Sequence, residues 1–214
     1  MTDMASDPRE LAMFPLGSVL FPSVVLPLHV FEPRYRAMTR HLLSGEVEPE
    51  FGVVLIERGN EVGGGDQRLD VGTLARIAEA EELPDGRWAV VAFGVSRLRV
   101  RTWLPDDPWP RAVVEGLPDD PDGDGATERW DVLRSRIRRV LGLAAELGEA
   151  RVPATIELAP DPALGTFQAG AALPMGPLDQ QRVLSCAGVD ARLEVLERLV
   201  DEQAELLEAR LRMG

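Results

Sequence analysis

Three side chains that could take part in chemistry lie close together in the sequence: the carboxylate of Glu32, the guanidinium group of Arg34 and the phenol of Tyr35. In the structural interpretation, Glu32 and Pro33 open a helix, because a carboxylate complements the positive end of the helix dipole and proline suits the first helical position. Tyr35 then enters the core and Arg34 forms an ion pair. In the functional interpretation, these side chains contact a ligand.

Other groups that commonly perform chemistry are scarce. The chain has two histidines, His29 and His41, and one cysteine, Cys186. These are too few nitrogen and sulfur ligands for a closed structural zinc site. No hydrolase, metalloprotease or redox motif of the forms G-x-S-x-G, H-E-x-x-H or C-x-x-C occurs. Because acidic residues are abundant, the sequence does not exclude a pair of catalytic carboxylates. An enzyme of unrecognised type is therefore one alternative.

All 23 basic residues are arginine, and lysine is absent. Without lysine there is no P-loop, which needs an ammonium group at the phosphates, and no Ser–Lys dyad. The formal net charge of -13 repels phosphate backbones, so nucleic acid is a disfavoured partner. We therefore expect no ATP hydrolysis, no peptidase activity and no cofactor.

An acidic segment rich in proline and glycine, residues 117–125, partly matches a calcium-binding loop. The candidate ligands are Asp120, Asp122, Asp124 and Asp131. The last of them replaces the glutamate usual at the twelfth position, and Pro118 and Pro121 exclude a helix leading into the loop. We interpret residues 118–126 as a solvated linker between two domains, with calcium binding as the alternative.

The N-terminal half has the pattern of a small sheet with one early helix. Residues 24–31 alternate as in a strand, and Pro22 and Pro27 make it an edge strand or a bulged one because proline cannot donate to a ladder. The helix is expected from Pro33 to Gly45. Gly94 predicts a bulge or a sharp bend within a later strand. The remaining strands are expected over residues 51–57, 71–83, 88–93, 95–103 and 111–117.

Three arginines alternate with apolar residues along the strand expected at 95–103. Arg97, Arg99 and Arg101 would share one face. A solvated face is the favoured interpretation, because half-buried antiparallel strands normally show this alternation. The alternative is a basic ladder for an acidic partner.

The C-terminal half has helical periodicity. Apolar residues spaced by three and four run from Trp130 to Leu147, with Arg134, Arg136, Arg138 and Arg139 on the same segment. Shorter helices are expected over residues 161–173 and 178–187, and a last helix begins with Asp190 as its cap. Short connections between such helices predict a bundle.

No segment has the pattern of a membrane span or a leader. Residues 13–31 are apolar, but Pro15, Gly17, Pro22 and Pro27 disfavour a helix there. The polar, acidic start of the chain lacks the apolar region of a signal peptide. We therefore expect a soluble, cytoplasmic protein.

The order of several short blocks carries a family resemblance. Residues 15–16, 21–22, 26–28 and 31–36 (PL, FP, LPL and FEPRYR), followed by 51–54, 71–77 and 94–100, resemble the N-terminal, substrate-binding domain of Lon proteases. The resemblance covers roughly residues 13–212. It implies a PUA-like pseudo-barrel and binding of unfolded or tagged proteins. It implies such a domain standing alone, since the lysine-dependent ATPase and protease modules of that family are absent.

These observations together predict an α+β protein with an antiparallel, PUA-like β pseudo-barrel and one early helix, followed by a C-terminal helical bundle. The expected parts are a disordered tail (1–12), a β-rich domain (13–117), the linker (118–126) and the bundle (127–214). The favoured function is non-enzymatic polypeptide binding, as an adaptor in protein quality control with a separate protease or ATPase as partner. An RNA-binding module is the alternative. The polypeptide-binding candidates are Phe21, Phe31, Glu32, Arg34, Tyr35, Trp103 and Trp109.

Overall fold

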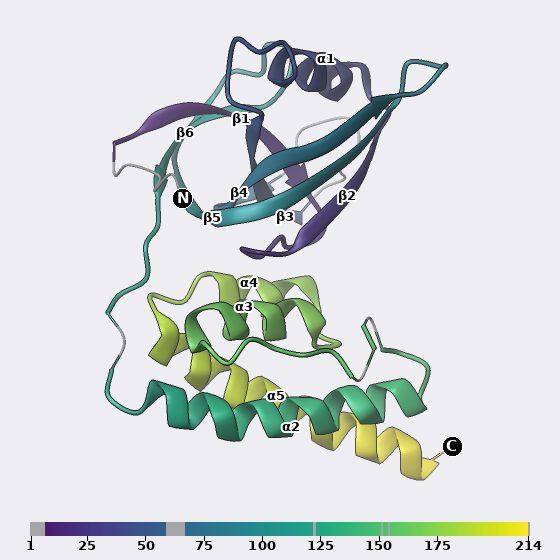
Figure 1. Ribbon diagram of the computed structural model, residues 1–214, viewed down its shortest axis with the longest axis vertical. Helices are drawn as coiled ribbons and strands as arrows, with labels where there is room; N and C mark the ends of the chain where they lie inside the picture. The colour runs from purple at the N-terminus through teal and green to yellow at the C-terminus, as the bar shows by residue number, and fades with distance from the viewer. Residues whose placement is uncertain (1–6, 59–66, 122, 151, 154, 214) are drawn as a thin grey trace. The chain divides into compact units, whose positions relative to one another are not determined.

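The chain divides between Pro118 and Asp119 into two units with different secondary structure. The first unit is β-rich and the second is helical (Figure 1). The computed structural model describes residues 7–58, 67–121, 123–150, 152–153 and 155–213. The expected α+β class, with a β-rich part preceding a helical part, is confirmed.

The β-rich unit contains a mixed sheet. Its strands are β1 (Arg9–Leu16), β2 (Val25–Val30), β3 (Glu50–Arg58), β4 (Gln67–Glu82), β5 (Trp88–Leu104) and β6 (Arg111–Gly116). Their order is β2-β5-β4-β3-β1-β6, and β6 also pairs with β5, so every strand except β2 belongs to a closed ring. The pseudo-barrel expected from the sequence is present, although β1 and β3 are parallel to each other.

The length of β5 allows it to serve two partners on one side. Its first part, residues 88–93, pairs with β2, and its last part, residues 98–104, pairs with β6. A register shift against β4 falls at residues 94–96, which confirms the bulge expected at Gly94. A Cβ at Gly94 would lie 2.2 Å from the carbonyl oxygen of Phe21, so two backbones approach here as closely as only glycine permits.

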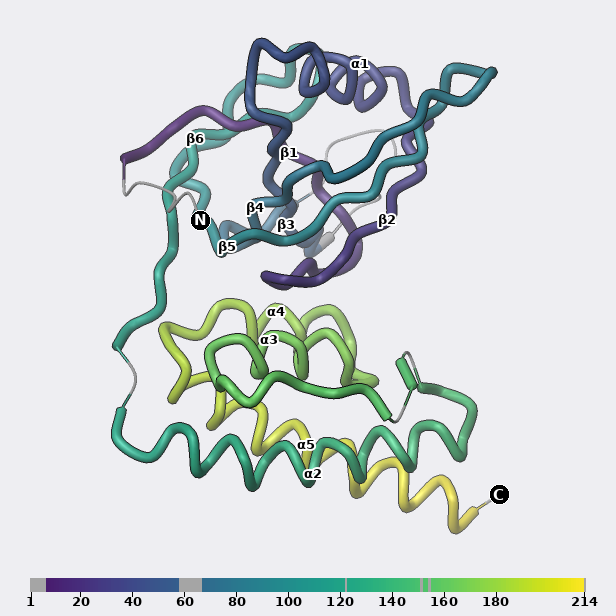
Figure 2. Tube along the Cα trace, viewed as in Figure 1, coloured from purple at the N-terminus to yellow at the C-terminus, as the bar shows by residue number. Residues whose placement is uncertain are grey.

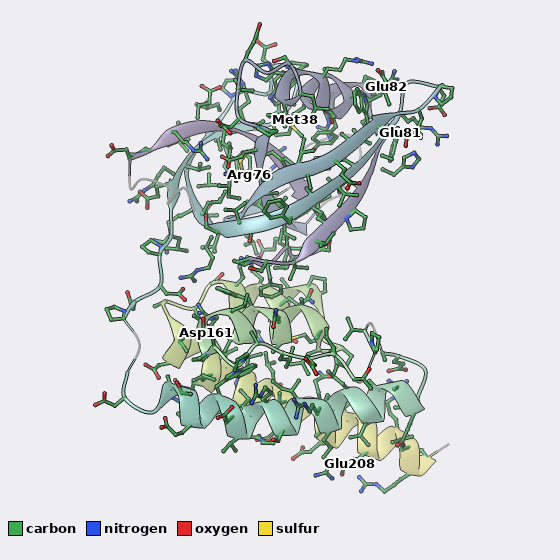
Figure 3. The ribbon with its side chains drawn as sticks, in the orientation of Figure 1. Met38, Arg76, Glu81, Glu82, Asp161 and Glu208 are labelled. Carbon is green, nitrogen blue, oxygen red and sulfur yellow. The ribbon has the colours of Figure 1, made fainter. Side chains whose placement is uncertain are left out.

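The early helix, α1 (Pro33–Leu42), covers one side of the sheet (Figure 1). Pro33 occupies the first turn, and Glu32 is extended with φ -66° and ψ 138°, as a residue before proline prefers. Tyr35 and Met38 are buried in the apolar cluster that α1 shares with the sheet. Figure 3 shows Met38 on the side of α1 that faces the sheet. The helix ends at Leu42, three residues before the expected stop at Gly45.

Alternation along the strands separates two apolar clusters. Phe14 and Leu16 of β1 join a cluster beneath α1, whereas Leu11 and Met13 point to a second cluster shared with β5 and β6. A β-strand directs successive side chains to opposite faces, so one strand can serve both clusters. The cluster beneath α1 therefore depends on the ends of β1 and β2, and the second cluster fills the closed ring.

The prediction of a solvated arginine face on β5 is wrong for Arg97. Its side chain is only 3% exposed, and Nη2 donates to the carbonyl oxygen of Pro118 at 3.1 Å. Arg99 and Arg101 are exposed as expected, and Arg101 pairs with Glu115 on β6. Arg97 differs because the chain leaving β6 folds over it, which the alternation along β5 cannot reveal.

The helical unit consists of α2 (Ala126–Glu146), α3 (Pro162–Ala172), α4 (Pro177–Leu184) and α5 (Val189–Met213). The predicted apolar stripe of α2 is buried as expected, with Trp130 at its start and Ala144 near its end. Trp130 Nε1 donates to the carbonyl oxygen of Ala159 at 2.8 Å, which satisfies the one polar atom of this ring.

The two long helices, α2 and α5, lie side by side and run in the same direction (Figure 2). Ion pairs connect them in matching order: Arg129–Glu197, Arg136–Asp201 and Arg139–Glu208. Glu208 lies toward the C-terminal end of α5 (Figure 3). Arg136 and Arg139 thus lie along the helix surface as expected and pair with carboxylates of α5, whereas Arg134 pairs with Asp131 of α2 itself.

The expected disordered tail, residues 1–12, is too long. Residues 9–12 already belong to β1 and pair with residues 111–114 of β6. Arg111 Nη1 also donates to Glu10 at 2.9 Å, which reinforces this pairing. Nonlocal pairing with β6 orders a segment whose polar sequence gave no sign of it.

The expected linker, residues 118–126, is partly packed against the helical unit. Arg192, fully buried on α5, donates two hydrogen bonds to the Asp119 carboxylate and one to the Thr166 hydroxyl. The Asp190 carboxylate accepts from the backbone N–H of Gly123 at 2.7 Å. The sequence predicts Asp190 as the cap of α5, but the helix already begins at Val189. The Asp190 side chain instead binds the backbone of the segment before α2.

Candidate functional site

A gap in the sheet separates the second half of β1 from β2. Residues 13–16 of β1 pair with β3, and β2 pairs with β5. Among the strands that the structure describes, none pairs with the other edge of β2. A pocket of about 200 Å³ lies here, which we call the β2 pocket. Its lining residues are Phe14, Leu16, Pro27, Leu28, His29, Val30, Phe31, Glu32 and Tyr35.

The wall of the β2 pocket is aromatic. Phe14 and Tyr35 stack with ring centroids 4.0 Å apart and an interplanar angle of 8°. Tyr35 is only 3% exposed, whereas Phe31 is 52% exposed where the chain turns from β2 into α1. The pocket therefore combines a rigid, stacked wall with one large apolar side chain in contact with solvent.

A chain of charged contacts runs from the rim of this pocket to β5. Arg34 Nε donates to Glu32 at 3.1 Å, and Arg34 also lies 3.9 Å from Asp106. Arg68 approaches the same Asp106 oxygen at 3.9 Å, and its guanidinium group lies 4.5 Å from the centre of the Trp103 ring. Opposite charges alternate along these contacts, so each partly compensates its neighbour.

The structure thus brings together five of the seven binding candidates. Phe31, Glu32 and Tyr35 line the pocket, and the charged contacts connect Arg34 and Trp103 to them. Phe21 is completely buried and cannot meet a ligand at the surface. Tyr35 is also a core residue, so it can act only as part of the pocket wall.

The last candidate, Trp109, lies in a second and larger pocket of about 600 Å³, the Trp109 pocket. Its ring stacks against His41 of α1 with centroids 5.3 Å apart. Glu50 lines the same pocket and accepts hydrogen bonds from Arg9 and Arg76. Burial alone would raise the pKa of Glu50, but the bonds from both arginines outweigh burial and lower the pKa below its usual value.

Sequence reasoning missed Arg68, Asp106 and six of the nine residues that line the β2 pocket. The six are Phe14, Leu16, Pro27, Leu28, His29 and Val30. Arg68 and Asp106 are ordinary charged residues in the sequence, and only folding places Arg68 beside Trp103 and Asp106 between Arg34 and Arg68. Pro27 was recognised as a sign of an edge strand but was not assigned to a site. The proline interruption could have identified the pocket, because an edge strand leaves its outer backbone groups available.

The alternative calcium loop is not supported by the described aspartates. Asp131 lies within α2 and pairs with Arg134 at 2.7 Å, and Asp120 forms a bridge to Gly188. Asp122 falls outside the described residues. Within the described part of the chain, no group of three or more His, Cys, Asp or Glu side chains is placed to hold a metal ion. Among the same described residues, no helix is both long enough and apolar enough to cross a membrane.

Residues 10–202 match the family model described as ATP-dependent protease La (LON) substrate-binding domain. Lon protease 2 of Sorangium cellulosum is 30% identical in an alignment of 219 positions, which spans 96% of this chain and 26% of that protein. Lon protease 2 of Herpetosiphon aurantiacus is 28% identical over 95% of this chain and 25% of its own length. The chain spans about a quarter of the length of these relatives.

Solved structures of Lon N-terminal domains are also similar to this chain. A Lon N-terminal domain protein from Xanthomonas campestris superposes with a TM-score of 0.62 at 25% identity, covering 89% of this chain and 98% of that one. The N-terminal domain of a Mycobacterium avium complex Lon protease superposes with a TM-score of 0.63 at 16% identity, over 90% and 98% of the two chains. The second match shows a shared fold alone.

Proposed function

The chain belongs to the LON substrate-binding domain family, and from this premise we propose that it binds exposed apolar segments of unfolded or tagged proteins. The β2 pocket carries this proposal. It offers an apolar, partly enclosed volume beside an exposed phenylalanine, and exposed apolar surface with a polar rim is typical of a binding site. Glu32 and Arg34 supply that rim.

Binding without catalysis is the second part of the proposal. The family match falls on a substrate-binding domain, and the chain contains no lysine for a P-loop or a Ser–Lys dyad. The ATP-dependent proteolysis named in the family description would then be performed elsewhere. We propose that the domain works in protein quality control by presenting bound proteins to a protease or ATPase.

The affinity for an unfolded protein should be weak and nearly independent of salt. The available apolar surface is modest, and an unfolded chain loses conformational entropy when it docks. Apolar contacts are not screened by ions, in contrast to contacts with phosphate groups. An RNA-binding module would instead lose affinity steeply as salt rises.

The test is a fluorescence titration of a labelled, permanently unfolded protein and of a labelled single-stranded RNA, each at low and high salt. We expect saturable binding of the unfolded protein at both salt concentrations and no comparable RNA binding. Salt-sensitive RNA binding without binding of the unfolded protein would overturn the proposal and favour an RNA-binding module. ATP hydrolysis that follows the protein through two purification columns would contradict the non-catalytic part.

A further inference from the structure

We infer that the open edge of β2 binds an extended, uncharged polypeptide segment as an added β-strand, with one apolar side chain of that segment in the β2 pocket. This inference rests on the proposed function and specifies its binding mode. It depends on which backbone groups of β2 face away from β5, on the size of the pocket and on the local charge.

The direction of the backbone groups follows from the start of the ladder. The Ser23 N–H donates to the Gly94 carbonyl at 2.8 Å, and the Gly94 N–H donates to the Val24 carbonyl at 2.9 Å. Ser23 has φ 63°, so these contacts form a bulge in which Ser23 and Val24 together oppose Gly94. In an antiparallel pair, hydrogen-bonded and non-hydrogen-bonded residue pairs then alternate.

This alternation assigns every second residue of β2 to the open edge. Leu26, paired with Ala92, directs its backbone groups toward β5, and Leu28 and Val30 follow the same phase. The intervening residues, Val25, Pro27 and His29, direct theirs away from β5. Pro27 fits this phase independently, because a residue without an N–H can occupy the outward position without breaking the ladder.

The open edge therefore presents three carbonyl acceptors, at Val25, Pro27 and His29, and two N–H donors, at Val25 and His29. This arrangement matches the backbone of an extended peptide, in which donors and acceptors recur every two residues. Pro27 removes the central donor, which weakens self-association of the edge while leaving the donors on either side. Protection against self-association would explain Pro27 but not the apolar pocket beside it, whereas binding of a peptide uses both.

The pocket determines which side chain the segment would insert. Its volume of about 200 Å³ exceeds the roughly 150 Å³ of an engineered cavity that accommodates benzene. A phenylalanine or leucine side chain therefore fits, beside the stacked rings of Phe14 and Tyr35. Residues 21–31 contain no Asp, Glu, Lys or Arg, and the Glu32 carboxylate at the rim is paired with Arg34. An uncharged segment matches this surface, and the net charge of -13 disfavours an acidic one.

The first test uses a fluorescein-labelled nine-residue peptide of threonine and valine with a central phenylalanine. Fluorescence anisotropy measures its affinity for the full chain, and single backbone N-methyl groups are then placed at successive peptide positions. N-methylation at positions of one parity should weaken binding about tenfold or more, since it removes a donor and adds a clash at the edge. N-methylation at the other parity should have little effect.

The second test changes the edge itself. His29→Pro removes an outward donor and should weaken the peptide complex roughly two- to tenfold, the equivalent of one backbone hydrogen bond. His29→Ala keeps that donor and is the matched control. Pro27→Val adds a donor and should strengthen binding by a similar factor. The peptide scan on the unchanged protein decides the question if the proline variant does not fold.

Equal effects of N-methylation at both parities, together with equal binding by His29→Pro and His29→Ala, would overturn strand addition while leaving the proposed function intact. Binding of an unfolded protein without binding of the peptide would also overturn it. A protein that sediments as a dimer, and as a monomer after His29→Pro, would assign the edge to a second copy of the chain. Failure to bind both the peptide and the unfolded protein would reject the proposed function as well.

Discussion

The β-rich unit and the helical unit both pair arginines with their own carboxylates, and the β-rich unit has an open strand edge in addition. The helical unit binds its arginines to its own carboxylates, from the buried Arg192–Asp119 pair to the surface pairs between α2 and α5. The β-rich unit leaves one edge of β2 without a partner strand in the described residues and has an apolar pocket beside it. Internal pairing stabilises a scaffold, whereas available backbone and apolar groups permit recognition. We therefore propose that recognition takes place in the first unit.

The largest expected effect tests the internal pairing of the helical unit. Asp119→Ala leaves the guanidinium group of Arg192 buried without its carboxylate, beside the Phe167 ring. Removing one partner of a buried pair should cost about 3 kcal/mol of unfolding free energy. Hydrogen exchange of the full chain should show faster opening of α3 and α5 and little change in the β-strands.

Asp124→Ala, an exposed neighbour in the same segment, is the control and should be nearly neutral. Asp119→Leu combined with Arg192→Met should recover much of the loss, because well-packed apolar residues can replace a buried ion pair. Equal effects of the two alanine substitutions would contradict the assigned role of Asp119.

The second prediction concerns Glu50, where the β-rich unit also uses internal pairing. Glu50→Gln should lower the unfolding free energy by about 1–2 kcal/mol near neutral pH, since Arg9 and Arg76 lose a charged acceptor but stay partly hydrated. The pKa of Glu50 is lowered in the folded state, so its stabilisation is present above its ordinary value of 4.5 and is lost as the pH falls through the folded pKa.

Chemical denaturation at a series of pH values measures this difference. The gap between the wild type and Glu50→Gln should narrow as the pH drops below 4.5. Glu48→Gln, an exposed neighbour, serves as the control and should follow the wild type. A gap that stays constant down to acidic pH would show that the charge of Glu50 is not what stabilises the unit.

The third prediction compares one exposed apolar residue from each unit. Phe31→Ala should weaken binding of an unfolded protein about tenfold, as loss of an aromatic anchor commonly does. Leu178→Ala in the helical unit is the matched control, because Leu178 is 57% exposed and Phe31 is 52% exposed. Both variants should keep nearly wild-type stability. A larger loss of binding in Leu178→Ala would move recognition to the helical unit.

Local patterns in the sequence predicted the elements of the fold better than the contacts between distant segments. The apolar stripe beginning at Trp130 and the edge position of β2 both follow from spacing and from proline chemistry. The burial of Arg97 and the Arg192–Asp119 pair depend on partners 21 and 73 residues away, which no local pattern encodes. For the same reason the sequence could not show that Trp109 lies apart from the other binding candidates. The pocket that contains Trp109 is formed by β1, α1 and the β5–β6 connection, which are distant in the sequence.

The smallest expected effect concerns salt. The pairs between α2 and α5 lie at the surface, and the hydrogen bond from Arg129 to Glu197 contributes most to raising the pKa of Arg129 above its usual value. Each exposed pair is worth only a few tenths of a kcal/mol and is screened by ions. Raising the salt concentration should therefore lower the unfolding free energy of the helical unit by about 1 kcal/mol or less.

Binding of an unfolded protein at the β2 pocket should change less than about twofold over the same salt range, because apolar contacts and backbone hydrogen bonds are not screened in this way. Hydrogen exchange of α2 and α5 and anisotropy titrations, run in the same buffers, measure the two effects side by side. Arg139→Gln, which removes the exposed pair with Glu208, should reduce the salt dependence of the helical unit without changing binding. The opposite result would be an affinity that falls steeply with salt while the stability of the helical unit does not change. It would contradict this comparison, because the charges that matter would then lie at the binding site and not between α2 and α5.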